Sequence, residues 1–301
     1  MANEKIRLSV LHRLWHDYRM TDLTTFSPDH PLILAGCGNM GGALLDGWLA
    51  AGLRPDAVYI VDPQLARQGS GRSGIRCVTE PGDLPAALQP GMLMLAVKPQ
   101  LMADVVPDYV PLVQQAGASV VSIAAGIGMA SYESWFGSHT PIVRVMPNTP
   151  AAVGQGLSLL LRNNVVDAEL AALSEVMLSA VGPCLWVERE SQIDALVGVT
   201  GSGPAYVFLL MECMATAVER AGLSPEQAQM AARQTILGAA ILADRQAGID
   251  PGELRRRVTS PGGVTQAALN VLMDEKRGLT ALFPEAMEAG ERRNAALSGE
   301  S

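Results

Sequence analysis

The stretch that most constrains the fold of this chain is residues 32–62, LILAGCGNMGGALLDGWLAAGLRPDAVYIVD. It opens with a short apolar run, residues 32–35, which is typical of a strand buried on both faces of a parallel sheet. Gly36, Gly38 and Gly41 follow in G-x-G-x-x-G spacing, and a helical apolar pattern then leads to a second apolar run that ends at Asp62. The order strand, glycine turn, helix, strand predicts a dinucleotide-binding unit.

Each glycine has its own role in such a unit. Gly36 permits a tight turn, Gly38 lets the backbone approach a pyrophosphate, and Gly41 lets the helix pack on the strand. The free N–H groups and the positive dipole end of the helix then face the phosphates. Glycines also occur in structural turns, but the flanking pattern favours cofactor binding over that alternative.

Composition narrows the classes of function. The 301 residues are enough for two domains, and the net charge of −8 without an extended basic run argues against a nucleic-acid partner. The arginines at positions 255–257 are interpreted as a solvated helix face. The four cysteines lack metal-ligand spacing, so we expect free thiols and no metal site. Neither an apolar run of membrane-spanning length nor a signal peptide is recognised, so we expect a cytoplasmic protein without a membrane partner.

Three regions are expected along the chain. Residues 1–30 are an N-terminal arm of unknown role, in which residues 6–18 fit an amphipathic helix. Residues 31–190 form a Rossmann-type α/β domain with a doubly wound, mostly parallel sheet, and residues 191–301 form an all-α domain. The further strands predicted in the α/β domain are residues 75–78, 92–97, 119–124, 141–146, 157–162 and 183–187, and the further helices are residues 83–88, 100–115 and 167–180.

The C-terminal domain is predicted to be a set of apolar helices. Ser224-Pro225 and Asp250-Pro251 each supply an N-cap followed by a proline at the first helical position. The helices are apolar around much of their circumference, which favours a homodimer through this domain, and a thick bundle within one chain is the alternative. The predicted helices are residues 204–221, 224–247, 264–273 and 279–297, with another starting at residue 251.

The scarcity of histidine and lysine restricts the chemistry. No histidine lies in the helical domain, and its one lysine, Lys276, lies in a polar, solvated stretch. This disfavours dehydrogenases that use a histidine acid or a helical-domain lysine. Lys98 follows a predicted strand and is placed near the cofactor, with an exposed loop lysine as the alternative. A protonated imine accepts hydride without a strong general acid, so these residue counts favour imine over ketone reduction.

Residues 260–265, SPGGVT, are the most distinctive feature of the helical domain. Successive glycines before a helix N-terminus expose N–H donors, and Ser260 and Thr265 add hydroxyl groups. The arrangement suits a small anion such as a substrate carboxylate, and a simple capped turn is the alternative.

Six segments of the chain carry a resemblance to a known family. They are GCGNMGGALLDGW (36–48), LAVKPQ (95–100), SIAAGI (122–127), VRVMPNTPAAVGQG (143–156), GSGPAYVF (201–208) and TSPGGVTQAAL (259–269). Together they resemble the pyrroline-5-carboxylate reductases, and the resemblance extends from about residue 32 to residue 297. It implies NAD(P)H-dependent reduction of Δ1-pyrroline-5-carboxylate to L-proline, the last step of proline biosynthesis. It also implies homodimers that can assemble into larger rings, with the substrate loop contributed by the partner subunit.

The resemblance also implies the roles of individual residues. Thr265 is the expected catalytic group, hydrogen-bonded to the ring nitrogen of the substrate. The expected substrate-carboxylate loop is Ser260, Gly262, Gly263, Val264 and Thr265. The expected cofactor site is Gly36, Cys37, Gly38, Asn39, Met40, Gly41, Asp62, Asp83, Ala96, Val97, Lys98, Pro99, Ala125 and Asn148.

Two acidic residues depart from the family pattern. Asp62 stands where family members often have a small polar residue, and its carboxylate can accept from a ribose 2′-OH but would repel a 2′-phosphate. Asp83 stands where an asparagine often serves the adenosine phosphate, and Arg67 or Arg72 can offset the added charge. The preference between NADPH and NADH is therefore open, and we expect NADH to be used at least comparably with NADPH.

Two other functions stay open at this point. One is a reductase of a different cyclic imine or of an F420-type cofactor. The other is a non-catalytic, dinucleotide-sensing regulator on the same fold, which would be expected to lose the loop at residues 260–265.

Overall fold

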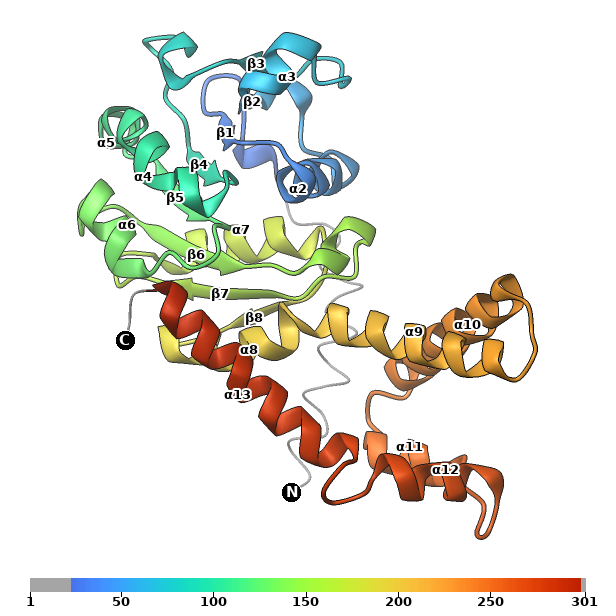
Figure 1. Ribbon diagram of the computed structural model, residues 1–301. Helices are drawn as coiled ribbons and strands as arrows, with labels where there is room; N and C mark the ends of the chain where they lie inside the picture. Colours follow the sequence, from blue (N-terminus) through green and yellow to red (C-terminus); the bar gives the residue numbers. More distant parts are fainter. Residues whose placement is uncertain (1–22, 299–301) are drawn as a thin grey trace. The chain divides into compact units, whose positions relative to one another are not determined.

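The computed structural model of the chain describes residues 23–298, with side chains described to residue 293 (Figure 1). The helix expected within residues 6–18 lies outside the described residues. The described chain divides into two compact units, one ending at Gly201 and the other running from Ser202 to Arg293.

The first unit is built on an eight-stranded sheet in the order β3-β2-β1-β4-β5-β6-β7-β8. Neighbouring strands are parallel except β6 and β7, which pair antiparallel. This confirms the doubly wound, mostly parallel sheet. The strands are β1 (Leu32–Ala35), β2 (Val58–Val61), β3 (Arg76–Val78), β4 (Met92–Leu95), β5 (Ser119–Ser122), β6 (Ile142–Met146), β7 (Ser158–Arg162) and β8 (Cys184–Trp186).

Helices cover both faces of this sheet. Side chains of β1, β4 and β6 alternate between two apolar clusters, one against α2 and α7 and the other against α4, α5 and α6. Trp48 of α2 is fully buried, and its indole Nε1 donates a 2.8 Å hydrogen bond to the carbonyl oxygen of Met177 in α7. The helices are α2 (Asn39–Ala50), α3 (Pro63–Gln68), α4 (Met102–Val105), α5 (Val110–Ala116), α6 (Met129–Phe136), α7 (Ala168–Ser179) and α8 (Glu190–Thr200).

Two helix predictions in this unit are wrong. The single helix expected over residues 100–115 is divided into η5 (Pro99–Leu101), α4, η6 (Val106–Asp108) and α5. Pro107 and Pro111 explain the division, because proline donates no backbone hydrogen bond and its ring clashes with the preceding turn. The helix expected over residues 83–88 is absent, and η4 (Pro81–Asp83) ends where it was expected to begin. The sequence prediction also missed α3 and α6.

The second unit is entirely helical among its described residues. The predicted caps are confirmed: Ser224 Oγ accepts from the N–H of Gln227 at 3.3 Å, and Asp250 Oδ1 accepts from the N–H of Gly252 at 2.8 Å. Its helices are α9 (Gly203–Arg220), α10 (Pro225–Arg245), α11 (Pro251–Arg257), α12 (Val264–Leu272) and α13 (Leu279–Ser298).

Large apolar side chains of this second unit are exposed on the isolated chain. Its buried hydrophobic residues, among those described, are Ala215, Ala228 and Ala232, where α9 packs on α10. The exposed ones include Phe208 and Leu209 on α9, Met230, Leu237 and Ile241 on α10, and Val271 on α12. Such a surface is typical of a helical unit that is covered by a partner.

One segment of the described chain, Glu190–Arg220, is long and apolar enough to cross a membrane by length and composition alone. No apolar run of that length was expected from the sequence. The segment comprises α8 and α9, and only 17% of its most apolar window is buried. A single stretch of this kind is weak support for a membrane span, because helices packed inside soluble proteins have the same composition.

Candidate dinucleotide and substrate sites

The glycine turn between β1 and α2 has the geometry that its spacing predicts. Gly36 adopts φ of +82°, which favours glycine. A Cβ atom at Gly36 would lie 2.9 Å from the carbonyl oxygen of Ala96, and one at Gly41 would lie 2.7 Å from that of Gly36. At Gly38 no such neighbour lies within 4 Å. The turn therefore packs closely against Ala96 and Val97 and leaves open space at Gly38, as the approach of a pyrophosphate requires.

A cavity of about 520 Å³ opens at this turn. No side chain caps the start of α2, which borders the cavity. The first N–H groups of the helix therefore have no side-chain capping partner there. These features fit the phosphates of a dinucleotide. The lining residues are Cys37, Gly38, Asn39, Gly42, Ala43, Asp46, Asp62, Gln64, Leu65, Arg72 and Ala152.

Asp62 joins the glycine turn to the end of β2. Its Oδ2 accepts a 3.0 Å hydrogen bond from the backbone N–H of Cys37. Its Oδ1 accepts from the N–H groups of Gln64 at 2.9 Å and Leu65 at 3.1 Å, as the N-cap of α3. The carboxylate is held rigidly at the cavity wall, on the side where this fold places the adenosine ribose.

Arg72 places a positive charge on the same cavity wall. Its Nε donates a 2.8 Å hydrogen bond to Asp46 Oδ1, and both residues line the cavity. From the sequence, Arg67 and Arg72 were alternative candidates to offset the charge of the two acidic residues. The structure places Arg72, and not Arg67, at the cavity. Gln64 is a second cavity residue that the sequence prediction did not include.

The Cys37 thiol adds no charge to this cavity. Burial raises the pKa of Cys37 to about 11, although the nearby Arg72 guanidinium opposes the shift. The thiol is therefore protonated at neutral pH.

The other predicted cofactor residues lie outside the cavity. Lys98 precedes η5 after β4, Ala125 follows β5, and Asn148 follows β6, so all three lie at the carboxyl edge of the parallel strands. Met40, in the first turn of α2, packs against the core. Pro99 is the first residue of η5.

Two of the predicted polar residues already have structural partners. The amide of Asn148 accepts from the N–H of Leu157 at 2.8 Å and donates to the carbonyl oxygen of Thr200 at 2.9 Å. Asp83 Oδ2 accepts from the N–H groups of Thr79 at 3.2 Å and Glu80 at 3.3 Å, which caps η4.

The predicted substrate loop lies in the second unit, between α11 and α12. Gly262 adopts φ of +68°, and the Gly263 N–H donates a 3.0 Å hydrogen bond to the Ser260 carbonyl oxygen. A Cβ atom at Gly263 would lie 2.4 Å from Ser260 Oγ, so the turn brings that hydroxyl close to the start of α12. Gly263 is the N-cap of α12 and provides no side-chain cap. Ser260, Val264 and Thr265 are exposed at this helix start.

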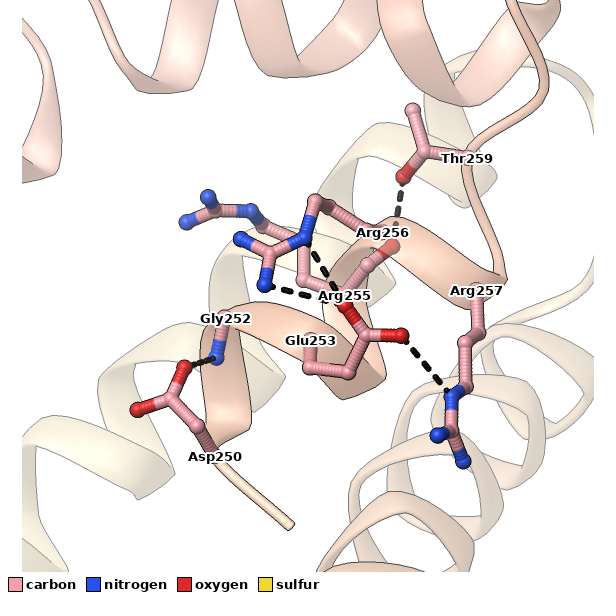
Figure 2. A network of polar contacts seen from close by, with 7 residues as sticks. All are labelled: Asp250, Gly252, Glu253, Arg255, Arg256, Arg257 and Thr259. Atoms are coloured by element: carbon pink, nitrogen blue, oxygen red, sulfur yellow. Dashed lines mark hydrogen bonds and ion pairs between the residues drawn. The ribbon is translucent and has the colours of Figure 1, made fainter.

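A basic cluster precedes the loop on α11 (Figure 2). Glu253 accepts from Arg256 Nε at 2.9 Å and from Arg257 Nε at 3.1 Å, and both arginines are largely exposed. Thr259 Oγ1 donates a 2.6 Å hydrogen bond to the Arg255 carbonyl oxygen and closes the end of the helix. The cluster is a solvated helix face, as the sequence predicted.

Among the described residues, no group of three or more histidine, cysteine, aspartate or glutamate side chains is placed to hold a metal ion.

The open glycine turn at the carboxyl edge of a doubly wound sheet, together with an uncapped helix start, defines a dinucleotide-binding protein of the Rossmann class.

Comparisons with known proteins narrow this class to one family. Residues 190–297 match the family described as pyrroline-5-carboxylate reductase dimerisation, and residues 32–126 match the family described as NADP oxidoreductase, coenzyme F420-dependent. The pyrroline-5-carboxylate reductase of Pseudomonas aeruginosa is 41% identical over 263 residues, which cover 87% of this chain and 95% of that protein. This chain belongs to the pyrroline-5-carboxylate reductase family.

Solved structures agree with this assignment. A pyrroline-5-carboxylate reductase from Coxiella burnetii matches with a TM-score of 0.82 at 34% identity, covering 89% of this chain and 98% of that one. A Plasmodium falciparum pyrroline carboxylate reductase with NADP bound matches with a TM-score of 0.75 at 25% identity, covering 90% and 98%. The resemblance found in the sequence is confirmed.

Proposed function

We propose that this chain catalyses the NAD(P)H-dependent reduction of Δ1-pyrroline-5-carboxylate to L-proline. The observation that carries the proposal is the presence, in a member of this family, of two anion-accepting helix starts: the open glycine turn at Gly38 and the uncapped α12 start at Gly263. Residues 31–190 bind the dinucleotide, and residues 191–301 form the dimerisation and substrate domain. The working form is a cytoplasmic homodimer that can assemble into a ring of dimers, without nucleic acid or membrane, and residues 1–30 are assigned no role.

The two sites divide the work between cofactor and substrate. Residues 36–41 hold the pyrophosphate, Asp62 and Arg72 face the adenosine end, and residues 96–99, Ala125 and Asn148 lie toward the nicotinamide. The bound dinucleotide supplies the hydride. The N–H groups at residues 262–265 and the Ser260 hydroxyl bind the substrate carboxylate, because a helix start attracts an anion.

Thr265 is the proposed catalytic residue. Its hydroxyl hydrogen-bonds the ring nitrogen and orients the C=N bond toward the nicotinamide. A protonated imine is already electrophilic, so positioning and electrostatics suffice without a strong general acid.

Replacement of this hydroxyl tests the mechanism. For Thr265→Ala we expect kcat to fall by about tenfold or more, because the ring nitrogen loses its positioning partner, with the dinucleotide Kd unchanged. The measurement is NAD(P)H oxidation on adding pyrroline-5-carboxylate, with the dinucleotide Kd from fluorescence titration. Equal turnover by the variant and the parent chain would remove Thr265 from the mechanism. Absence of oxidation by the parent chain, with turnover of a six-membered or 2-carboxylate imine, would identify a different cyclic-imine reductase.

The proposal extends to the cofactor preference. The fixed Asp62 carboxylate supports acceptance of a ribose 2′-OH, and Arg72, already paired with Asp46, is the available counter-charge for a 2′-phosphate. We expect kcat/KM with NADH to be at least comparable to that with NADPH. Steady-state kinetics with each cofactor check this, and a hundredfold preference for NADPH would contradict it.

A further inference from the structure

Helix α8 is tied at both ends to the loops that follow β5 and β6. At its first residue, Glu190 Oε1 accepts a 2.6 Å hydrogen bond from the backbone N–H of Met129, where the loop after β5 enters α6. Its Oε2 pairs with the guanidinium of Arg144, a β6 residue whose side chain is only 6% exposed. One carboxylate therefore joins α8, α6 and β6.

The last residue of α8 is held by the amide of Asn148. The Asn148 Nδ2 donates to the carbonyl oxygen of Thr200 at 2.9 Å, while its Oδ1 accepts from the N–H of Leu157 at 2.8 Å. Residues 147–157 are the loop between β6 and β7. This amide fixes both ends of that loop to the end of α8.

Apolar packing holds the middle of the same helix. Ile193 is buried and Leu196 is half-buried in a cluster with Leu159, Leu161 and Val187. The helix is thus anchored along its whole length, and its two polar anchors are directed at the two loops that carry Ala125 and Asn148.

We propose that α8 is a positioning element, through which Glu190, Arg144 and Asn148 keep the loops after β5 and β6 in the geometry required for hydride transfer. This inference rests on the proposed function for its catalytic consequence. Buried Arg144 needs a partner, so loss of the Glu190 charge leaves an uncompensated cation and displaces the helix start. A displacement of about 1 Å at a reacting centre can lower the rate by roughly a hundredfold.

Asn163 provides a matched control for Asn148. Its Oδ1 accepts from the N–H of Ile142 at 3.2 Å and its Nδ2 donates to the carbonyl oxygen of Thr140 at 3.0 Å, so it also bridges a backbone donor and a backbone acceptor. These bonds lie at the opposite end of β6. Asn148→Ala and Asn163→Ala therefore remove the same kind of bond, at the site and away from it.

The test compares Glu190→Gln, Asn148→Ala and Asn163→Ala in the full-length protein. We expect kcat to fall by about tenfold or more in the first two and to change by less than about twofold in Asn163→Ala, with the dinucleotide Kd of Glu190→Gln within about threefold of the parent. Amide hydrogen exchange with NADP⁺ present should rise at residues 123–128 in Glu190→Gln and at residues 147–157 in Asn148→Ala. Asn163→Ala should leave exchange in both loops unchanged.

Two results would overturn the inference. One is kcat for Glu190→Gln and Asn148→Ala no lower than for Asn163→Ala, and the other is parent-like exchange in both loops. Absence of pyrroline-5-carboxylate reduction by the parent chain would instead contradict the proposed function. Hydrogen exchange still decides the role of α8 in that case, because it does not depend on turnover.

Discussion

Gly36 and Gly38 are two residues apart and differ in what a side chain would meet. Gly36 combines a left-handed backbone with close contact to the Ala96 carbonyl oxygen, whereas Gly38 has φ of −71° and open space in front of it. The first glycine is therefore required by the fold, whereas the fold leaves space for a side chain at the second, so a glycine there agrees with its proposed role in ligand binding.

Alanine substitutions should separate these two requirements. Gly36→Ala should lower the free energy of unfolding by roughly 1–2 kcal/mol or more, because of its left-handed conformation and the clash with the Ala96 carbonyl oxygen. Gly38→Ala should change that free energy by less than about 0.5 kcal/mol and raise the dinucleotide Kd by about tenfold or more. Urea unfolding and fluorescence titration provide the two measurements. An equal loss of stability in both variants would contradict the distinction.

At the scale of elements, a fully buried aromatic side chain, Trp48, joins α2 to α7. Trp48 packs within the core and its indole satisfies the Met177 carbonyl oxygen. This contact fixes the helix whose N-terminus borders the cavity at the glycine turn.

Removing that hydrogen bond should destabilise the protein. Trp48→Phe leaves the Met177 carbonyl oxygen without its donor, and we expect a loss of about 1–3 kcal/mol in the free energy of unfolding. Trp135→Phe, at a half-buried tryptophan on α6, is the control and should lose less. Urea midpoints measured side by side decide the matter, and a smaller loss at position 48 would show that the bond contributes little.

At the scale of the whole molecule, buried thiol and phenol groups make the free energy of unfolding depend on pH in the alkaline range. Burial raises the pKa of Cys37 to about 11 and the pKa values of Cys184 and Tyr132 to about 12. In an unfolded chain thiols titrate near pH ~8.5 and tyrosines near pH ~10. The unfolded chain therefore releases these protons first as the pH rises.

The sign of the effect follows from this difference. Stability from these groups is fully present below the unfolded pKa values and is lost as the pH rises from about 9 toward about 12. We expect the urea midpoint to fall between about pH 8 and pH 10.5, and the Cys37→Ser/Cys184→Ser double variant to fall less steeply. A midpoint that is constant or rising over this interval would contradict the prediction.

The sequence predicted the sheet well and the details of the site unevenly. Short apolar runs located the central strands β1, β2, β4 and β5, because burial on both faces leaves little freedom in residue type. The edge strands β3 and β8 were also located, although they are only partly buried. The glycine spacing likewise predicted the open turn at Gly38. Proline at positions 107 and 111 was a signal for the broken helix that the prediction did not use.

Long-range polar partners were not predictable in the same way. The Arg144–Glu190 pair joins residues 46 apart, and the Asn148–Thr200 bond joins residues 52 apart. No local periodicity encodes such pairings, because they depend on how the strands are ordered. The direction of β7, which pairs antiparallel with β6, was likewise not predictable, because its apolar pattern fits either direction.

The few buried alanines of the second unit have a consequence for how the chain responds to dilution. A set of helices that encloses so little apolar surface on its own has too small a gain to offset the entropy of ordering. Folding of this part is then coupled to association and obeys mass action, so its melting temperature rises with protein concentration. Stability of a chain that assembles through such helices is a property of the oligomer and has to be quoted with the concentration at which it was measured.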